Sequence, residues 1–186
     1  MTKQEYTKVN IDYSSTNKKI QKLPYTGEFM EPLFRPAEIE DINDICHGLE
    51  RSFIPLLDGY YKNGYYPYFA NRKWIEDKIE NEFVYVCQID DEVRGAIILC
   101  QEPDAYHLKV HTIYVDEAFR RKGLATFLIL NAEAVHSDAV YWQLETMADL
   151  KGNISLYEKM GYKPYSEPKI VNEKVTIVYY RKITLS

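Results

Sequence analysis

Apolar residues recur every three or four positions along several stretches of the chain, which is the spacing of one face of a helix. The first of these stretches carries Ile39, Ile42, Ile45 and Leu49, with acidic residues crowded near its start. Acidic side chains favour the first turn of a helix, where the helix dipole is positive. The spacing predicts helices over Glu38–Ser52, Trp74–Asn81, Leu124–Val135 and Asn153–Met160.

Between these stretches, β-branched and aromatic residues gather in short runs that predict strands. The polar turn Asp90-Asp91-Glu92 separates two such runs and favours a hairpin. Because helices and strands alternate, the pattern predicts an α/β domain with one mixed sheet. The expected strands are Leu33–Ala37, Phe83–Gln88, Val93–Gln101, Leu108–Val115, Val140–Thr146 and Val175–Ile183, with a further short one near Tyr165.

Two segments show neither period. Residues 1–30 are polar and predict an N-terminal extension, which leaves residues 31–186 as one domain of ordinary size. Pro55–Lys73 is rich in tyrosine and admits two interpretations. It is either a loop whose rings cover the end of the core or a lid that faces a substrate, since tyrosine offers both apolar area and a hydroxyl.

Composition narrows the class of protein. The chain of 186 residues is 46% hydrophobic and 27% charged, which is typical of a globular domain. A net charge of −5 argues against a nucleic-acid partner, which usually binds a basic protein. No apolar run has the length of a membrane span and no secretion signal is evident, so we expect a cytoplasmic protein without a membrane partner. The three cysteines lack metal-ligand spacing, and we expect no metal.

The stretch from His111 to Val135 combines the end of a strand, a basic loop and the start of a helix. Gly123 stands where the loop becomes the helix. Backbone N–H groups at a helix start have no intrahelical acceptor, and a glycine allows an anion to approach them closely. The stretch therefore predicts a pyrophosphate site. It is neither a P-loop, because no Lys-Ser or Lys-Thr follows the glycine, nor a Gly-x-Gly-x-x-Gly dinucleotide motif.

Two motifs in this order resemble the GNAT superfamily of N-acetyltransferases. Arg120-Arg121-Lys122-Gly123-Leu124-Ala125 matches the acetyl-CoA motif Arg/Gln-x-x-Gly-x-Gly/Ala, and Asn153 to Tyr162 is similar to a second family motif. The resemblance covers roughly Leu33 to Ile183. It implies the acyl-CoA N-acyltransferase fold, which is a mixed, mostly antiparallel sheet flanked by helices, and it implies acetyl-CoA as the cofactor. The cofactor-binding residues implied are Ile113, Tyr114, Val115, Arg120, Arg121, Lys122, Gly123, Leu124, Ala125, Thr126 and Asn153.

The resemblance also suggests catalytic residues. Tyr157 matches the tyrosine of the family's Tyr-x-x-x-Gly-Phe/Tyr motif, so we expect it to be the general acid near the thioester sulfur. Two general bases remain open: Glu145, placed as in the ribosomal-protein N-terminal acetyltransferases, and His111, placed as in the arylalkylamine N-acetyltransferases. Alternation along a strand predicts that His111, Ile113 and Val115 share one face. For each candidate the alternative is a structural role.

One position departs from the family. The asparagine that usually stands seven residues before the tyrosine is Leu150 here, and Asn153 is expected to serve as a helix cap. The predicted function is transfer of an acetyl group to a primary amine of a small molecule or a protein. Acidic residues such as Asp41 and Asp44 slightly favour a cationic acceptor. A non-catalytic acyl-CoA-binding regulatory module is the alternative, and a homodimer remains open.

Overall fold

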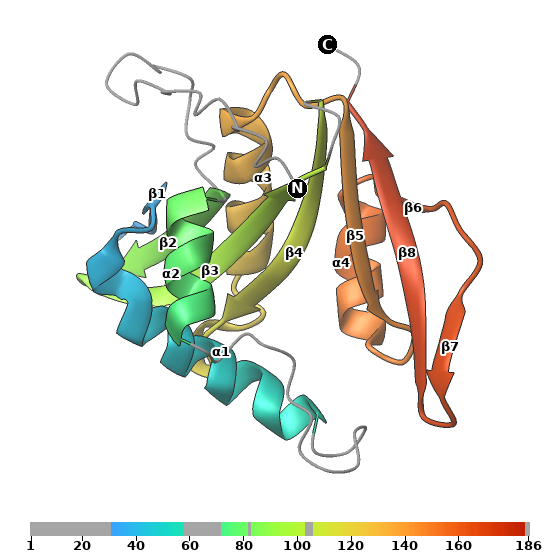
Figure 1. The fold of residues 1–186 in the computed structure, drawn as a ribbon, viewed down its shortest axis with the longest axis horizontal. Helices are drawn as coiled ribbons and strands as arrows, with labels where there is room; N and C mark the ends of the chain where they lie inside the picture. Colours follow the sequence, from blue (N-terminus) through green and yellow to red (C-terminus); the bar gives the residue numbers. More distant parts are fainter. Residues whose placement is uncertain (1–30, 58–71, 82, 103–105, 185–186) are drawn as a thin grey trace, which may run out of the picture.

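The computed structural model describes residues 31–57, 72–81, 83–102 and 106–184. An eight-stranded sheet runs through the described part in the order β1-β2-β3-β4-β5-β8-β6, with β7 also paired to β8 (Figure 1). The elements are β1 Leu33–Pro36, α1 Ile42–Leu57, α2 Arg72–Asn81, β2 Phe83–Ile89, β3 Glu92–Gln101, β4 His107–Val115, α3 Leu124–Val135, β5 Tyr141–Met147, α4 Lys151–Lys159, β6 Lys163–Pro164, β7 Lys169–Asn172 and β8 Val175–Ile183.

The predicted order of helices and strands is confirmed, as is a mostly antiparallel mixed sheet with helices on both faces. The hairpin between β2 and β3 turns at Asp90 and Asp91, both with positive φ, as a two-residue hairpin turn requires. The structure adds β7, whose four residues are too few to show an alternating pattern. The predicted N-terminal extension and most of the tyrosine-rich segment lie outside the described residues.

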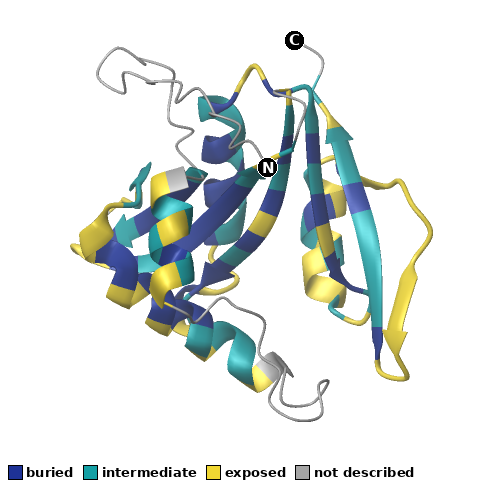
Figure 2. Ribbon diagram, viewed as in Figure 1, coloured by how far each residue is buried: buried dark blue, intermediate teal, exposed yellow. Residues whose placement is uncertain are grey.

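Two apolar clusters hold the layers together. On one face of the sheet, α1 and α2 cover β2 to β4 with a cluster that includes Ile45, Ile75 and Tyr114. On the other face, α3 and α4 share a larger cluster that includes Leu128 and Trp142. Figure 2 shows how the buried residues are distributed over the helices and the sheet. The larger cluster reaches from β1 to β8, so it is what joins the two ends of the sheet.

The sheet opens between β4 and β5, its parallel pair. These strands are paired only from His107 opposite Tyr141 to Val110 opposite Leu144. Beyond that point β5 continues alongside β8 as far as Met147, while β4 runs on beside β3 to Val115 (Figure 1). The carboxyl ends of the two strands therefore splay apart. We call this opening the split; strand ends of this kind are where open α/β sheets bind their ligands.

Candidate active site

The loop after β4 ends in a helix start with free backbone donors. Gly123 is the N-cap of α3 and adopts φ 90°, a left-handed conformation that favours glycine. The first intrahelical bond runs from the Phe127 N–H to the Gly123 carbonyl at 2.9 Å. The amides of Leu124, Ala125 and Thr126 consequently have no acceptor within the helix. Together with the helix dipole, these donors form a site suited to an anion.

The three basic residues before this helix have different surroundings. Arg120 turns back: its Nε donates to the Val115 carbonyl at 3.1 Å and its Nη2 donates to Ser52 Oγ at 3.3 Å. The Lys122 ammonium lies 5.2 Å from the centre of the Phe119 ring. Arg121, also in a left-handed conformation, is exposed and makes no ion pair with a described residue. Arg120 therefore links the loop to α1, and of the two arginines Arg121 is the one that is available to bind an anion.

Ion pairs at the base of the loop fix its path. Asp116 lies 3.1 Å from Arg51 of α1 and 3.6 Å from Arg94 of β3. The Arg94 guanidinium also stacks on Phe119, 5.0 Å from the ring centre. A hollow of about 230 Å³ lies between these side chains and α1. The loop is thus attached to both neighbouring elements before it reaches Gly123.

A β-bulge places His111 on the face opposite to the predicted one. Ile98 of β3 pairs with Thr112 and the next residue, Leu99, pairs with Val110, so His111 is the extra residue on β4. The bulge shifts the alternation of side chains. As a result the His111 ring lies 5.4 Å from the Trp74 ring of α2, whereas Ile113 packs on the α3 side. The prediction that His111 shares a face with Ile113 and Val115 is wrong.

Both candidate bases lie on the same face of the sheet, because each follows a residue of the last pair, Val110 and Leu144, that packs in the larger cluster on the opposite face. Glu145 pairs with Lys109 of β4 at 3.3 Å, and its side chain is 45% exposed. His111 Nδ1 lies 2.8 Å from Thr112 Oγ1. His111 and Glu145 are each the first residue beyond the last β4–β5 pair, so they flank the point where the split begins.

Tyr157 occupies the other face of the sheet. Its side chain is 4% exposed and belongs to the larger cluster, which also contains Val110 and Leu144, the last pair before the split. Burial raises the pKa of Tyr157 to about 12. Tyr157 Oη has no hydrogen-bond partner among the described residues. It is nevertheless not one of the fully buried atoms without a partner, because in the described part of the chain Arg94 Nε is the only such atom. The hydroxyl oxygen must therefore keep contact with solvent.

The structure changes the roles of two further predicted residues. The N-cap of α4 is Leu150, whose carbonyl accepts from the N–H groups of Asn153 at 3.0 Å and Ile154 at 3.1 Å. The prediction that Asn153 caps the helix is wrong, because the helix begins at Lys151 and Asn153 lies in its first turn. The Tyr114 side chain packs under α1, with its hydroxyl 3.4 Å from the Asp44 carbonyl, so only its backbone can face a cofactor.

A polar cluster that the sequence did not reveal lies beyond Glu145 on the same face. Gln143 of β5 stands opposite Arg181 of β8. The Gln143 amide satisfies both of its ends when its oxygen accepts from Arg181 Nε at 3.0 Å and its nitrogen donates to the Tyr165 hydroxyl at 3.2 Å. No motif marks these residues. The available signal was the alternation of polar and apolar residues along β5.

Within the described ranges, no group of three or more histidine, cysteine or acidic side chains could hold a metal ion. None of the described helices has the length and apolarity needed to cross a membrane.

Comparisons with known proteins identify relatives of this architecture. The profile of the acetyltransferase (GNAT) family matches residues 43–162. No curated protein matches the chain in sequence.

Several solved structures share the fold. An N-acetyltransferase from Staphylococcus aureus Mu50 superposes with a TM-score of 0.68 at 21% identity, covering 84% of this chain and 100% of that one. The PaiA N-acetyltransferase of Thermoplasma acidophilum, solved with coenzyme A, gives 0.68 at 17% identity, with coverages of 81% and 98%. The ribosomal-protein-S18-alanine N-acetyltransferase of Escherichia coli gives 0.65 at 14% identity, with coverages of 82% and 94%. These matches confirm the predicted fold.

Proposed function

Because the chain belongs to the acetyltransferase (GNAT) family, we propose that it transfers the acetyl group of acetyl-CoA to a primary amine. One observation carries the proposal: His111 and Glu145 lie on one face of the sheet where the split begins, and Tyr157, from the helix that follows β5, lies in the cluster on the other face. A thioester held in the split would meet a proton donor on one side and a base on the other. A binding module has no need of this arrangement.

The residues around the split fit acetyl-CoA, which supplies the acetyl group as a thioester. The free amides of Leu124, Ala125 and Thr126, with the exposed Arg121 beside them, would hold the pyrophosphate. Past Val110, the edge of β4 that faces the split has no partner strand among the described residues, so its backbone groups can bond to an extended ligand. The predicted contacts of Ile113 and Val115 with the cofactor would be made by this edge. The contacts predicted for Lys122 and Asn153 remain predictions.

The amine must lose a proton before or during attack on the carbonyl carbon. Glu145 is solvated and paired with Lys109, which suits removal of the proton through a water molecule. His111 offers an imidazole, the group that titrates nearest to neutral pH in the absence of perturbation. Both side chains face the direction from which an acceptor can approach, because no described helix covers β5 on this face.

Tyr157 would act on the departing sulfur. With a pKa of about 12, its hydroxyl stays protonated at every pH at which the protein works. An ordinary thiol has a pKa near 8.5, so complete proton transfer from this phenol to the thiolate is uphill by about 5 kcal/mol. We therefore assign Tyr157 a hydrogen bond to the sulfur as the carbon–sulfur bond breaks, with solvent supplying the final proton.

The acceptor is a small molecule or a protein. The Escherichia coli relative named above acts on an alanine of a ribosomal protein, which supports a peptide-like amine as one class to test. The alternative function, an acyl-CoA-binding module without catalysis, predicts binding without turnover.

A direct test is incubation with acetyl-CoA and a panel of primary amines. We expect free CoA thiol and acetylated amine to appear in equal amounts. If Glu145 is the base, Glu145→Gln should lower the rate; if His111 is the base, His111→Asn should lower it. The variant that lacks the base should also lose the acidic limb of the pH–rate profile. Tight acetyl-CoA binding without thiol release, for peptide amines and small amines alike, would support the alternative.

A further inference from the structure

Arg181 stands on the face of β5 and β8 that no described helix covers, held in place by its neighbours. Its guanidinium lies 4.2 Å from the centre of the Tyr165 ring and 5.7 Å from that of Tyr141. In the amide orientation that satisfies both of its ends, the Gln143 side-chain oxygen accepts from Arg181 Nε at 3.0 Å and from Nη2 at 2.6 Å. Two rings and one amide thus fix the orientation of a planar cation that is still half-exposed.

The charge of Arg181 is not neutralised within the described part of the chain. Four other described arginines have carboxylate partners; for example, Arg35 pairs with Asp41 at 2.7 Å, and Arg94 pairs with Glu92 at 2.6 Å. No described carboxylate lies within ion-pair distance of Arg181, whose contacts are with rings and an amide. An oriented guanidinium without a carboxylate partner is suited to bind the carboxylate of a ligand.

The position of Arg181 relative to the split defines the size of that ligand. Arg181 lies opposite Gln143, two residues before Glu145 on β5. Two residues of a strand span about 6.6 Å, and the two residues of an extended dipeptide span nearly the same distance. A dipeptide-sized molecule can therefore place its amine at Glu145 and its carboxylate at Arg181.

We propose that the acetyl acceptor is a small zwitterionic amine of about dipeptide length, whose carboxylate binds Arg181 between Tyr141 and Tyr165. This inference rests on the proposed acetyl transfer for the place of the amine. It replaces the expectation of a cationic acceptor. Asp41, one of the acids behind that expectation, is bound to Arg35 at the other end of the sheet.

The test is direct binding to the CoA-saturated protein, measured by calorimetry, with alanylalanine and its C-terminal amide as the probes. The two ligands differ only in the carboxylate. We expect the dipeptide to bind at least tenfold more tightly than the amide, and more tightly than alanine, whose amine and carboxylate share one carbon. Arg181→Gln should reduce the preference to about onefold without changing the affinity for the amide, and Arg181→Lys should keep part of it.

Arg72→Gln, at an exposed arginine paired with Glu76 on α2, is the matched control and should keep the full preference. Melting temperatures must show that each variant is folded. A carboxylate preference that depends on Arg181 supports the inference. If the protein shows this preference but releases no CoA from acetyl-CoA, the proposed acetyl transfer is wrong and the carboxylate site stands. Equal binding of the dipeptide and its amide by the wild-type protein overturns the inference, whether or not amines are acetylated.

Discussion

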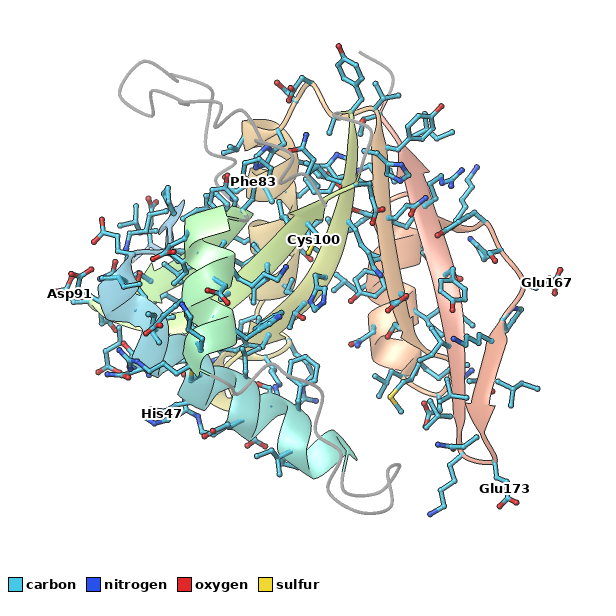
Figure 3. All side chains as sticks on the ribbon, viewed as in Figure 1. His47, Phe83, Asp91, Cys100, Glu167 and Glu173 are labelled. Carbon is cyan, nitrogen blue, oxygen red and sulfur yellow. The ribbon has the colours of Figure 1, made fainter. Side chains whose placement is uncertain are left out.

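The two halves of the sheet differ in how they are covered. β2 and β3 lie between helices on both faces, and their residues form nearly continuous buried runs, such as Val84–Cys87 and Ala96–Leu99. Among the described helices, none covers β5 on the face opposite α4, and its residues alternate from half-buried Tyr141 through buried Trp142 to exposed Glu145. Figure 3 shows the side chains of both halves, with Glu167 and Glu173 pointing away from the outer edge of the second half.

The difference separates packing from chemistry. In the covered half, the side chains on both faces of the strands contribute to the core, so few polar groups remain available. In the open half, the side chains on one face pack on the α4 side, and those on the other face can meet a ligand. The split is the border between the two halves, and every candidate base stands there.

Core packing should distinguish the halves most clearly. Leu99 in β3 is fully buried, and Leu99→Ala should cost about 2–5 kcal/mol of unfolding free energy. Ile183 in β8 is 56% exposed, and Ile183→Ala should cost less than about 1 kcal/mol. Urea denaturation with unchanged m-values measures both. Similar losses in the two variants would contradict the proposed division.

The covered half should also make stability depend on pH. His136 ends α3 beside Phe83 and Tyr85, where burial lowers its pKa to about 4, although Asp138 opposes the shift. Between pH 6.5 and about 4 the unfolded chain binds a proton that the folded protein does not. The unfolding free energy should therefore fall by about 3 kcal/mol as pH drops through this window, and should not change through this group above it.

His136→Gln keeps a polar partner for the Tyr85 hydroxyl and removes the titrating group. Denaturation at several pH values should show a shallower loss of stability for this variant than for the wild type. An identical pH slope in both proteins would mean that His136 is not the group responsible.

The two helix starts beside the split can be compared at matched positions. Thr126 in α3 and Asn153 in α4 are each the third helical residue after the N-cap. An aspartate at this position favours the helix dipole, so neither Thr126→Asp nor Asn153→Asp should destabilise the fold. If α3 holds the pyrophosphate, Thr126→Asp should weaken acetyl-CoA binding at least tenfold and the neutral Thr126→Asn should change it little. Asn153→Asp should weaken it less than threefold; equal losses at both positions would assign both helices to the cofactor.

Much of the fold could be predicted because hydrophobic spacing reports local structure. The period of apolar residues located α3 and β4 within a residue or two. The same reasoning failed at His111, because a bulge is defined by the partner strand and shifts the alternation without changing the local sequence. It also failed at Asn153. Asparagine is a favourable capping residue, but α4 begins two residues earlier, at Lys151, with Leu150 as its N-cap.

The candidate site was predictable only where a motif is contiguous. Gly123 and Tyr157 lie within short family patterns, and in the structure Gly123 caps α3 after β4 while Tyr157 lies in α4 after β5. Gln143, Tyr165 and Arg181 come together only through the pairing of β5 with β8 and of the loop after β6 with β8. Such long-range contacts leave no spacing signal, since each residue is ordinary in its own segment.

In the proposed mechanism, the split holds the thioester between Tyr157 on one face and a base on the other. The most direct test is the rate of acetyl transfer by Tyr157→Phe, which removes the hydroxyl and keeps the ring in its apolar cluster. We predict that kcat falls at least tenfold, about 1.4 kcal/mol of barrier, while the Kd for acetyl-CoA and the melting temperature change little. An unchanged kcat, in a reaction shown to be limited by the chemical step, would contradict the claim and leave Tyr157 with a packing role alone.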